Sequence, residues 1–336
     1  MSWKILATAS TIQGVGTAAA DALRAAGCAV TCSTPFGPLN AESLRAQLTD
    51  ADAVFASSDD YNAAVLTSPT AAKVKIISRW GVGYDCIHLP SATAQGIVVT
   101  YTPGLLDDAV ADYTFALLLG VARRIHVGHA AMSAGQWAPA WGHDVWQKTL
   151  GIVGCGRIGL AVARRASGFN MRVLAFDPAP SDAAKKLGVE FVSLPELLAQ
   201  SNFVSLHAAL TPGNRGLIGE KELRAMKSDA YLINASRGAL VDEIALVRAL
   251  TEGWIAGAAV DAYIVEPLPL DHPLRHAPNV LLAPHQASFA RDTGAKVSAL
   301  CAQAILDLHA GRRPQFVLNP EVLTSPALRA KLHSHA

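Results

Sequence analysis

The sequence predicts an α/β protein with two Rossmann-like or flavodoxin-like domains, each built on a parallel sheet, and a deep cleft between the domains. The first supporting observation is that short apolar runs alternate with helix-forming segments, a pattern typical of parallel sheets covered by helices on both faces. The second is the length of 336 residues, which allows about two domains. The third is a hydrophobic share of 51%, which provides enough apolar residues for large cores.

The N-terminal part of the chain carries the first set of alternating elements. Each expected strand is a short apolar run, and each expected helix is rich in alanine or leucine. We expect strands at residues 4–8, 29–32, 53–56 and 76–78, and helices at 18–26 and 41–48. Thr102-Pro-Gly104 then breaks the chain before an apolar helix at 108–124, which is a candidate hinge between the domains.

A glycine motif organises the second domain. The motif lies between an apolar run at 150–153 and a helix-forming segment at 160–166, and its glycines are Gly154, Gly156 and Gly159. The first glycine permits a tight turn, the second lets a pyrophosphate approach the backbone, and the third lets the helix pack closely on the sheet. Because the amino end of this helix also favours negative charge, the motif predicts a dinucleotide site.

Asp177 indicates which dinucleotide binds. It ends the second apolar run of this unit and lies 18 residues beyond Gly159. A carboxylate at this position can accept hydrogen bonds from the adenosine ribose, and it repels a 2′-phosphate. No Arg or Lys stands at 178–181 to pair with such a phosphate, so the sequence predicts NAD and not NADP. A second glycine pair, Gly14 and Gly16, lacks the third glycine and the acid and is interpreted as a turn.

The rest of the chain continues the alternation. We expect strands at 191–192, 203–207, 231–234, 258–260 and 280–283, helices at 194–200, 220–226 and 243–252, and a final helix at 291–308. This final helix is expected to return to the first domain. The segment 136–148 holds Trp137, Trp141 and Trp146 and predicts a buried arm, either at a subunit interface or packed against its own chain.

The composition excludes several classes of protein. The formal charge of +1 leaves no basic field for nucleic acid or anionic lipid, and no apolar run approaches the roughly 20 residues that span a bilayer. Five scattered cysteines argue against a disulfide framework and for a reducing, cytoplasmic location. His126 and His129 are spaced to share a metal, but no third ligand completes a site, so no metal is expected.

Three residues with catalytic chemistry follow the last three expected strands of the second domain. Arg237, Glu266 and His285 each come shortly after one of these strands, where ligands of open α/β sheets gather. Hydride transfer between a nicotinamide and a carbonyl carbon needs a fixed cation to polarise the carbonyl and an acid or base that titrates near neutrality. Arg237 suits the first role and His285 the second, with Glu266 orienting the imidazole and favouring its charged form.

With these motifs, the chain resembles the D-isomer-specific 2-hydroxyacid dehydrogenases over nearly its whole length. The segments that carry the resemblance are 81–85 (Gly-Val-Gly-Tyr-Asp), 102–104, 234–242 (Asn-Ala-Ser-Arg-Gly-Ala-Leu-Val-Asp), 261–267 (Asp-Ala-Tyr-Ile-Val-Glu-Pro) and 284–288 (Pro-His-Gln-Ala-Ser). The resemblance implies the same catalytic set and a homodimer built through the cofactor domains. It also implies a discontinuous substrate domain, residues 1–102 plus 290–336, and a NAD-binding Rossmann domain, residues 103–289.

The expected site residues combine the glycine motif with positions that the resemblance implies. For the cofactor they are Gly154, Gly156, Arg157, Ile158, Gly159, Asp177, His207, Ala208, Pro212, Ala235, Ser236, Arg237, Asp261, His285 and Ala287. For the substrate they are Arg79, Trp80, Gly81, Val82, Gly83, Arg237 and His285. In the substrate loop, the glycines let successive backbone N–H groups point at a carboxylate.

Two carboxylates bear on the substrate. Family members that act on phosphoglycerate usually have an arginine after the strand equivalent to 53–56. This chain has Ala-Ser-Ser-Asp-Asp at 56–60 instead, and the carboxylates of Asp59 and Asp60 would repel a phosphate. We therefore expect an unphosphorylated 2-oxo acid such as glyoxylate, hydroxypyruvate or pyruvate, with 3-phosphoglycerate dehydrogenase activity as the alternative. Tyr101 and Tyr113 depart from the family pattern near the cleft and leave the substrate side chain open. A non-enzymatic alternative is a NAD-sensing protein like the corepressors that resemble this family, and oxidation of phosphite or formate ranks lower.

Overall fold

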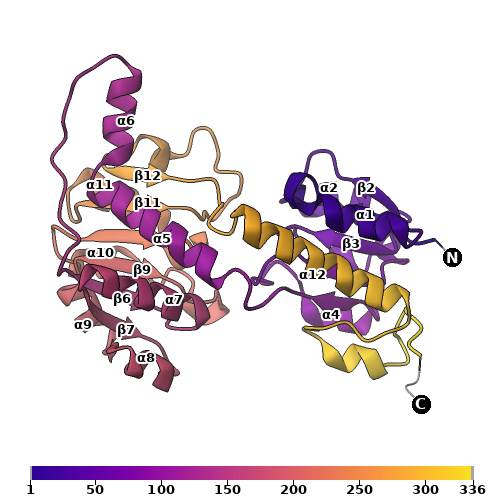
Figure 1. The fold of residues 1–336 in the computed structure, drawn as a ribbon. Helices are drawn as coiled ribbons and strands as arrows, with labels where there is room; N and C mark the ends of the chain where they lie inside the picture. Colours follow the sequence, from indigo (N-terminus) through magenta and orange to yellow (C-terminus); the bar gives the residue numbers. More distant parts are fainter. Residues whose placement is uncertain (1, 334–336) are drawn as a thin grey trace. The chain divides into compact units, whose positions relative to one another are not determined.

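The computed structural model describes residues 2–333 as two compact units, drawn in Figure 1. The first unit runs through Leu106 and resumes at Ser288, and the second unit spans Asp107–Ala287. Each unit is an α/β structure with one parallel sheet, so the fold class predicted from the sequence is confirmed. Among the described residues, no helix is both long and apolar enough to cross a bilayer.

The first unit is built on a parallel sheet of flavodoxin-like order, β2-β1-β3-β4-β5. Its strands are β1 (Lys4–Ala7), β2 (Ala29–Cys32), β3 (Ala53–Ala56), β4 (Ile76–Arg79) and β5 (Val98–Thr100). Its helices are α1 (Thr17–Ala25), α2 (Ala41–Gln47), α3 (Ala63–Leu66), α4 (Leu89–Ala94) and α12 (Arg291–His309). The C-terminal α12 lies beside α1 and packs on β4, where the Ser78 hydroxyl donates to the Cys301 carbonyl at 3.0 Å.

The second unit is built on a parallel sheet of order β12-β11-β10-β9-β6-β7-β8. Its strands are β6 (Thr149–Val153), β7 (Arg172–Phe176), β8 (Glu190–Phe191), β9 (Phe203–Leu206), β10 (Tyr231–Asn234), β11 (Gly257–Val260) and β12 (Val280–Leu282). Its helices are α5 (Asp107–Ala122), α6 (Ile125–Ser133), α7 (Arg157–Ala166), α8 (Asp182–Lys186), α9 (Leu194–Gln200), α10 (Glu220–Ala225) and α11 (Glu243–Thr251). This is the Rossmann order with one further strand, and the order of the strands reverses between β6 and β9.

Helices cover both faces of the second sheet. One buried cluster joins strand residues to α5 and α7, and another joins strand residues to α9, α10 and α11. The apolar runs of β9, β10 and β11 are buried along their whole length, as in a strand covered on both sides. Because the strands are parallel, the residues that follow β6, β9, β10, β11 and β12 gather at one edge of the sheet, and this edge carries the expected site.

Two expectations about the connection into the second sheet need correction. The helix α5 ends at Ala122, two residues before its predicted end, because Arg124 takes a left-handed conformation (φ 53°) and the separate helix α6 follows. The tryptophan segment is not buried against its own chain as an arm, since Trp137 is 86% exposed and Trp141 is 95% exposed, although Val145 near its end is buried. No residue of α6 is buried either. We call residues 125–144 the exposed arm of the second unit (Figure 1).

Candidate active site

The glycine turn after β6 has the shape that a dinucleotide needs. Gly154 has a positive φ of 92°, and a Cβ at this residue would lie 2.4 Å from the backbone nitrogen of Ala208. A Cβ at Gly159 would lie 2.3 Å from the carbonyl oxygen of Gly154, so the first turn of α7 packs directly on the loop. A Cβ at Gly156 would meet nothing within 4 Å, which leaves open space where a pyrophosphate approaches the backbone.

The amino end of α7 offers unpaired backbone donors to an anion. The helix begins at Arg157 after an N-cap at Gly156, and no side chain of the described residues caps this end. The N–H groups of Arg157, Ile158 and Gly159 therefore lie at the positive end of the helix dipole. The Arg157 side chain is 59% exposed, with its Nε 3.5 Å from Asp107. These features fit the pyrophosphate of NAD.

Asp177 follows β7 and is fixed by the backbone. Its Oδ2 accepts the N–H of Cys155 at 2.7 Å, and its Oδ1 accepts the N–H of Ala179 at 2.8 Å. Each carboxylate oxygen keeps a second lone pair for a ribose hydroxyl. Burial, followed by the charge of Asp177, raises the pKa of Cys155 to about 11, so this thiol is neutral at pH 7. The position of Asp177 fits an adenosine ribose and disfavours a 2′-phosphate.

The loops after β9 and β10 carry other expected cofactor positions. Burial lowers the pKa of His207 to about 4, so the ring is neutral at pH 7, and its Nε2 lies 2.8 Å from a neighbouring serine hydroxyl. The Ser236 hydroxyl donates to the Ala208 carbonyl at 2.8 Å, which ties the two loops together. Pro212 opens an exposed turn, and Ala235 lies half-buried just after β10. These positions follow β9, which neighbours β6, and β10, which is the next strand in the sheet.

A carboxylate–imidazole pair forms the centre of the candidate site. The two carboxylate oxygens of Glu266 lie 2.8 and 2.7 Å from the Nδ1 atom of His285. Because a carboxylate only accepts hydrogen bonds, Nδ1 carries a hydrogen, and Nε2 is left to exchange a proton with a substrate. Glu266 Oε1 also accepts the N–H of Tyr263 at 2.9 Å. The ring of His285 is therefore oriented by a carboxylate that is itself held by the backbone.

Glu266 is an anion at neutral pH. Burial opposes its ionisation, but the hydrogen bond and charge of His285, the Tyr263 N–H and the charge of Arg237 outweigh burial, so the pKa of Glu266 lies below its usual value. Folding lowers the pKa of this carboxyl, so its ionisation stabilises the native state at any pH above the pKa that it has in the unfolded chain. This stabilisation is lost as the pH falls through the pKa of the folded state. The pair with His285 therefore stays intact through the neutral range.

Asp261 supports the unusual backbone of His285. His285 has a φ of 51°, in the left-handed region that side chains disfavour. The Asp261 carboxylate accepts the N–H groups of Gln286 and Ala287, each at 2.9 Å. Burial raises the pKa of Asp261, although these two donors and His285 oppose the shift. Asp261 is 0% exposed, and both of its oxygens accept hydrogen bonds from the backbone directly after His285.

Arg237 lies on the loop after β10 and reaches the same group of residues. Its Nη1 donates to the Ser236 carbonyl at 2.9 Å. Its charge contributes to the lowered pKa of Glu266, so the guanidinium acts electrostatically on the pair. A Cβ at the next residue, Gly238, would lie only 1.9 Å from the carbonyl carbon of Tyr263. The structure thus brings the Arg237 loop against the loop that carries Glu266.

The expected substrate loop after β4 is held together by Arg79. Arg79 is 9% exposed; its Nε donates to the Gly83 carbonyl at 3.0 Å, and its Nη1 donates to the Trp80 carbonyl. Gly81, with a φ of 136°, provides the turn. The N–H groups of Val82 and Gly83 have no hydrogen-bond partner within residues 2–333. The loop therefore presents backbone donors of the kind that bind a carboxylate, whereas Arg79 binds the loop itself.

Two other residues on the expected substrate side belong to the scaffold. Trp80 is 5% exposed, and its indole N–H donates to the Ser298 hydroxyl at 3.0 Å. Asp59 is 0% exposed and accepts the Thr8 hydroxyl at 2.5 Å, and burial raises its pKa. Of the two carboxylates expected to repel a phosphate, only that of Asp60 is therefore exposed.

Comparisons with known proteins place the chain in a family. The family described as "D-isomer specific 2-hydroxyacid dehydrogenase, NAD binding domain" matches residues 115–287. A glyoxylate reductase from Korarchaeum cryptofilum is 47% identical over 260 residues, which cover 75% of this chain and 78% of that protein. A glyoxylate reductase from Thermofilum pendens is 42% identical over 295 residues, which cover 85% and 86%. The chain belongs to the D-isomer-specific 2-hydroxyacid dehydrogenases.

Solved structures agree with this assignment. A Thermus thermophilus protein matches with a TM-score of 0.82 and 39% identity, covering 94% of this chain and 99% of that one. A glyoxylate reductase from Paecilomyes thermophila matches with a TM-score of 0.80 and 31% identity, covering 95% and 99%. This 2-hydroxyacid dehydrogenase is an oxidoreductase with NAD as its cofactor, so the predicted family, enzyme class and cofactor are confirmed. The non-enzymatic alternative is thereby set aside.

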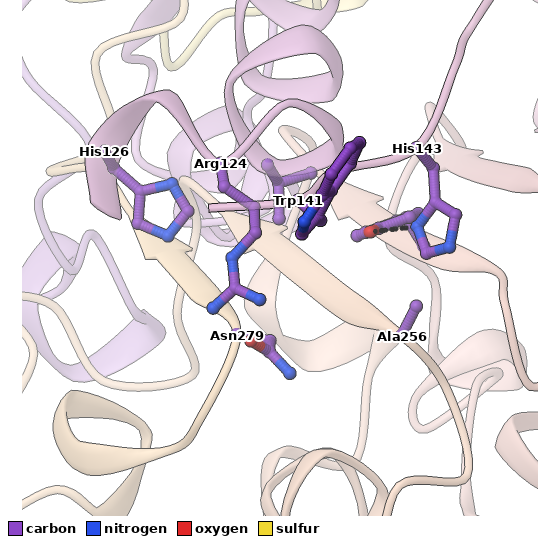
Figure 2. A pocket seen from close by; sticks show the side chains of 8 residues that line it. Arg124, His126, Trp141, His143, Ala256 and Asn279 are labelled. Atoms are coloured by element: carbon purple, nitrogen blue, oxygen red, sulfur yellow. Dashed lines mark hydrogen bonds between the residues drawn. The ribbon is translucent and has the colours of Figure 1, made fainter. Parts of the chain in front are cut away.

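The second unit of the dehydrogenase has a pocket away from these residues, shown in Figure 2. The pocket has a volume of about 160 Å³ and is lined by Val121, Arg124, His126, Trp141, His143, Tyr231, Ala256 and Asn279. Tyr231 begins β10, and Ala256 and Asn279 stand directly before β11 and β12. The pocket therefore lies at the amino edge of the sheet and belongs with the exposed arm, while His285 follows the carboxyl edge.

Two contacts near the Glu266–His285 pair of this dehydrogenase were not predicted from the sequence. The Gln286 side chain donates to the Tyr113 hydroxyl at 2.7 Å, and Tyr113 was noted only as a departure from the family pattern. Glu243 contacts the backbone of Ile264 and the ring of His272. In the sequence, Glu243 is indistinguishable from an ordinary acid in the first turn of a helix, because its burial depends on the folded loop.

Proposed function

We propose that this dehydrogenase uses NADH to reduce glyoxylate, hydroxypyruvate or a similar small unphosphorylated 2-oxo acid to the corresponding 2-hydroxy acid, with the D configuration where C2 becomes a stereocentre. The observation that carries the proposal is the contact of 2.7 Å between Glu266 and His285, which follow adjacent strands of a dinucleotide-binding sheet. The choice of substrate is supported by relatives named glyoxylate reductase, which are 40% to 47% identical to this chain.

The roles of the chain's residues follow from their chemistry. NADH, when bound, supplies the hydride that adds to C2 of the 2-oxo acid. His285 Nε2 gives a proton to the carbonyl oxygen during reduction and takes it back from the hydroxyl during oxidation. Glu266 orients the ring and stabilises the imidazolium before the proton leaves. Arg237 polarises the carbonyl and stabilises the negative charge that develops on its oxygen.

The binding groups are assigned on the same grounds. The first turn of α7 holds the pyrophosphate of NAD, and Asp177 holds its adenosine ribose. The backbone N–H groups of Val82 and Gly83 hold the substrate carboxylate. Arg79 is assigned to this loop and not to a substrate phosphate, because its Nε and Nη1 donate to loop carbonyls and the residue is only 9% exposed.

A substrate panel tests the proposal. NADH oxidation at about pH 7 is measured with glyoxylate, hydroxypyruvate, pyruvate and 3-phosphohydroxypyruvate. We expect one unphosphorylated acid to turn over at about 10 per second, with kcat/KM at least about tenfold above that of the phosphorylated acid. NADPH should support a much lower kcat/KM than NADH, because Asp177 repels its 2′-phosphate. Preference for 3-phosphohydroxypyruvate, or equal use of NADPH, would contradict the assignment.

We further propose that the enzyme is a homodimer joined through the exposed arm and the cofactor unit. Four apolar side chains of the arm, Ile125, Met132, Trp137 and Trp141, are 58% to 95% exposed. A patch of this kind, on α6 and the segment that follows it, needs a partner surface. In a two-fold interface, both chains contribute the same surface. Each chain of this enzyme carries the exposed indoles of Trp137 and Trp141 and the pocket at the base of the arm.

Light scattering after size exclusion tests the dimer. The wild-type enzyme is expected to have twice the chain mass of 35.2 kDa. The double variant Trp137→Ser with Trp141→Ser should shift to the monomer mass, because it removes the largest apolar groups of the arm. Leu187→Ser changes another exposed apolar residue of the same unit, 47% exposed, and should keep the dimer. A monomeric wild-type enzyme at micromolar concentration would refute the interface.

A further inference from the structure

The second unit contains another carboxylate–imidazole pair, Glu243 and His272. The Glu243 side chain is 7% exposed, and its Oε2 lies 3.2 Å from His272 Nε2. His272 Nδ1 accepts the N–H of Leu274 at 3.3 Å, so the ring hydrogen is on Nε2 and points to the carboxylate. The other oxygen, Oε1, accepts the N–H of Ile264 at 2.8 Å. Both oxygens of this buried acid therefore bind protein groups.

These contacts place Glu243 against the loop that carries the catalytic carboxylate. Ile264 stands two positions before Glu266, and the N–H of the preceding residue, Tyr263, donates to Glu266 itself at 2.9 Å. Two successive N–H groups of one loop thus bind two different carboxylates. The Tyr263 hydroxyl also donates to the Ala283 carbonyl at 2.8 Å, just after β12. The position of this peptide is therefore coupled to the position of the catalytic pair.

The same peptide contacts the loop that carries Arg237. A Cβ at Gly238 would lie 1.9 Å from the carbonyl carbon of Tyr263 and 2.3 Å from the nitrogen of Ile264. The two backbones are in direct contact, with no side chain between them. A shift of the Tyr263–Ile264 peptide would therefore disturb the Arg237 loop together with Glu266.

An acid at the start of a helix often serves only to stabilise the helix. In α11 that task is performed by Asp242, whose Oδ1 accepts the N–H groups of Ile244 and Ala245, each at 3.0 Å. Glu243 instead points its oxygens at the Ile264 backbone and at His272. Capping of α11 therefore does not account for a buried carboxylate at this position.

We propose that Glu243, supported by His272, is a positioning residue for the reduction. It fixes the Tyr263–Ile264 peptide and thereby holds Glu266 against His285. This inference rests on the proposed acid–base role of the Glu266–His285 pair. Glu243 itself does not touch the reacting groups in this assignment, so its effect should appear in proton transfer and not in NADH binding.

Kinetics of Glu243 variants provide the first test. Glu243→Ala is expected to lower kcat for glyoxylate reduction by about 10- to 100-fold, with the NADH dissociation constant within about twofold of wild type. Glu243→Gln should recover much of this loss, because its amide oxygen still accepts the Ile264 N–H. Glu252→Gln is the matched control, since Glu252 is the C-cap of the same helix with a side chain 48% exposed. It should behave as wild type.

A titration of the His285 ring by NMR provides the second test and needs no substrate. The charged groups around this ring are Glu266, Asp261 and Arg237. In Glu243→Ala, the pH at which His285 titrates should fall, because a displaced Glu266 favours the imidazolium less. An unchanged titration in a folded Glu243→Ala protein would overturn the inference. So would an equal loss of kcat and NADH affinity, which is the sign of a general structural defect.

The two failures can be told apart. If the wild-type enzyme turns over no 2-oxo acid, the proposed function fails, while the NMR titration still reports whether Glu243 positions Glu266. If Glu243→Ala does not fold, His272→Ala decides the matter by the same measurements, because it removes the donor that holds Glu243 Oε2. It is expected to shift the His285 titration in the same direction, and no shift would overturn the inference.

Discussion

Replacing His285 by glutamine is expected to lower kcat for glyoxylate reduction by about 1,000-fold, while the NADH dissociation constant stays within about twofold. The amide of glutamine cannot give or take a proton near neutral pH, so the carbonyl oxygen loses its proton donor. The loss should be equally large for glycolate oxidation, because the same Nε2 atom acts as the base in that direction. Steady-state kinetics in both directions and fluorescence titration with NADH measure these quantities.

The control for this variant is His276→Gln, which changes an exposed histidine of the same unit. It should leave kcat unchanged within about twofold. If His285→Gln keeps more than about a tenth of the wild-type kcat, the proton comes from another group, and the assignment of His285 fails. If NADH binding is lost together with turnover, the effect belongs to the fold of the cofactor site and not to proton transfer.

Replacing Arg237 by glutamine is expected to lower kcat/KM for glyoxylate by about 100- to 1,000-fold. The guanidinium is the charged group placed to stabilise the oxygen that becomes negative, and it also lowers the pKa of Glu266. Arg237→Lys should recover part of the activity, because it restores the charge but not the planar arrangement of donors. Kinetics with saturating NADH separate this effect from cofactor binding.

Arg248→Gln serves as the control for charge removal. Arg248 lies on α11, and its side chain is 48% exposed and pairs with the exposed Glu220. Its loss should change kcat/KM by less than about twofold. If Arg237→Gln raises only the KM for the 2-oxo acid and leaves kcat unchanged, Arg237 binds the substrate equally in the ground and transition states. The proposed role in polarising the carbonyl would then be wrong.

The geometry of the glycine turn and the proximity of Glu266 to His285 were predictable because each follows from local sequence. Gly154, Gly156 and Gly159 form one turn, and their different surroundings in the structure match the three tasks that their spacing predicts. Glu266 and His285 follow strands that are neighbours in a parallel sheet, so the sheet edge alone brings them near one another. In a parallel sheet, the order of the strands determines which of the following loops are neighbours. Residues that follow adjacent strands therefore lie near one another, although they are far apart in the sequence.

Other features depend on contacts that the sequence does not display. The role of Arg79 is decided by carbonyls of its own loop, and the burial of Asp59 is decided by a hydroxyl on β1's carboxyl end, Thr8. The sequence of the arm likewise does not display that Trp137 is 86% exposed and Trp141 95% exposed. In each case the residue type is compatible with several environments, and only the tertiary packing selects one.

The pH dependence of glyoxylate reduction tests acid–base catalysis by His285 and Glu266. The donor must be protonated in reduction, so kcat/KM should be constant at lower pH and fall about tenfold per pH unit once His285 loses its proton. For glycolate oxidation the base must be neutral, so kcat/KM should rise with pH over the same interval and then level off. Glu266 stays ionised through this range, because its pKa lies below its usual value. The predicted result is that kcat/KM falls with rising pH for reduction and rises over the same interval for oxidation. Profiles that are flat in both directions between about pH 5 and pH 9 would contradict acid–base catalysis by the Glu266–His285 pair.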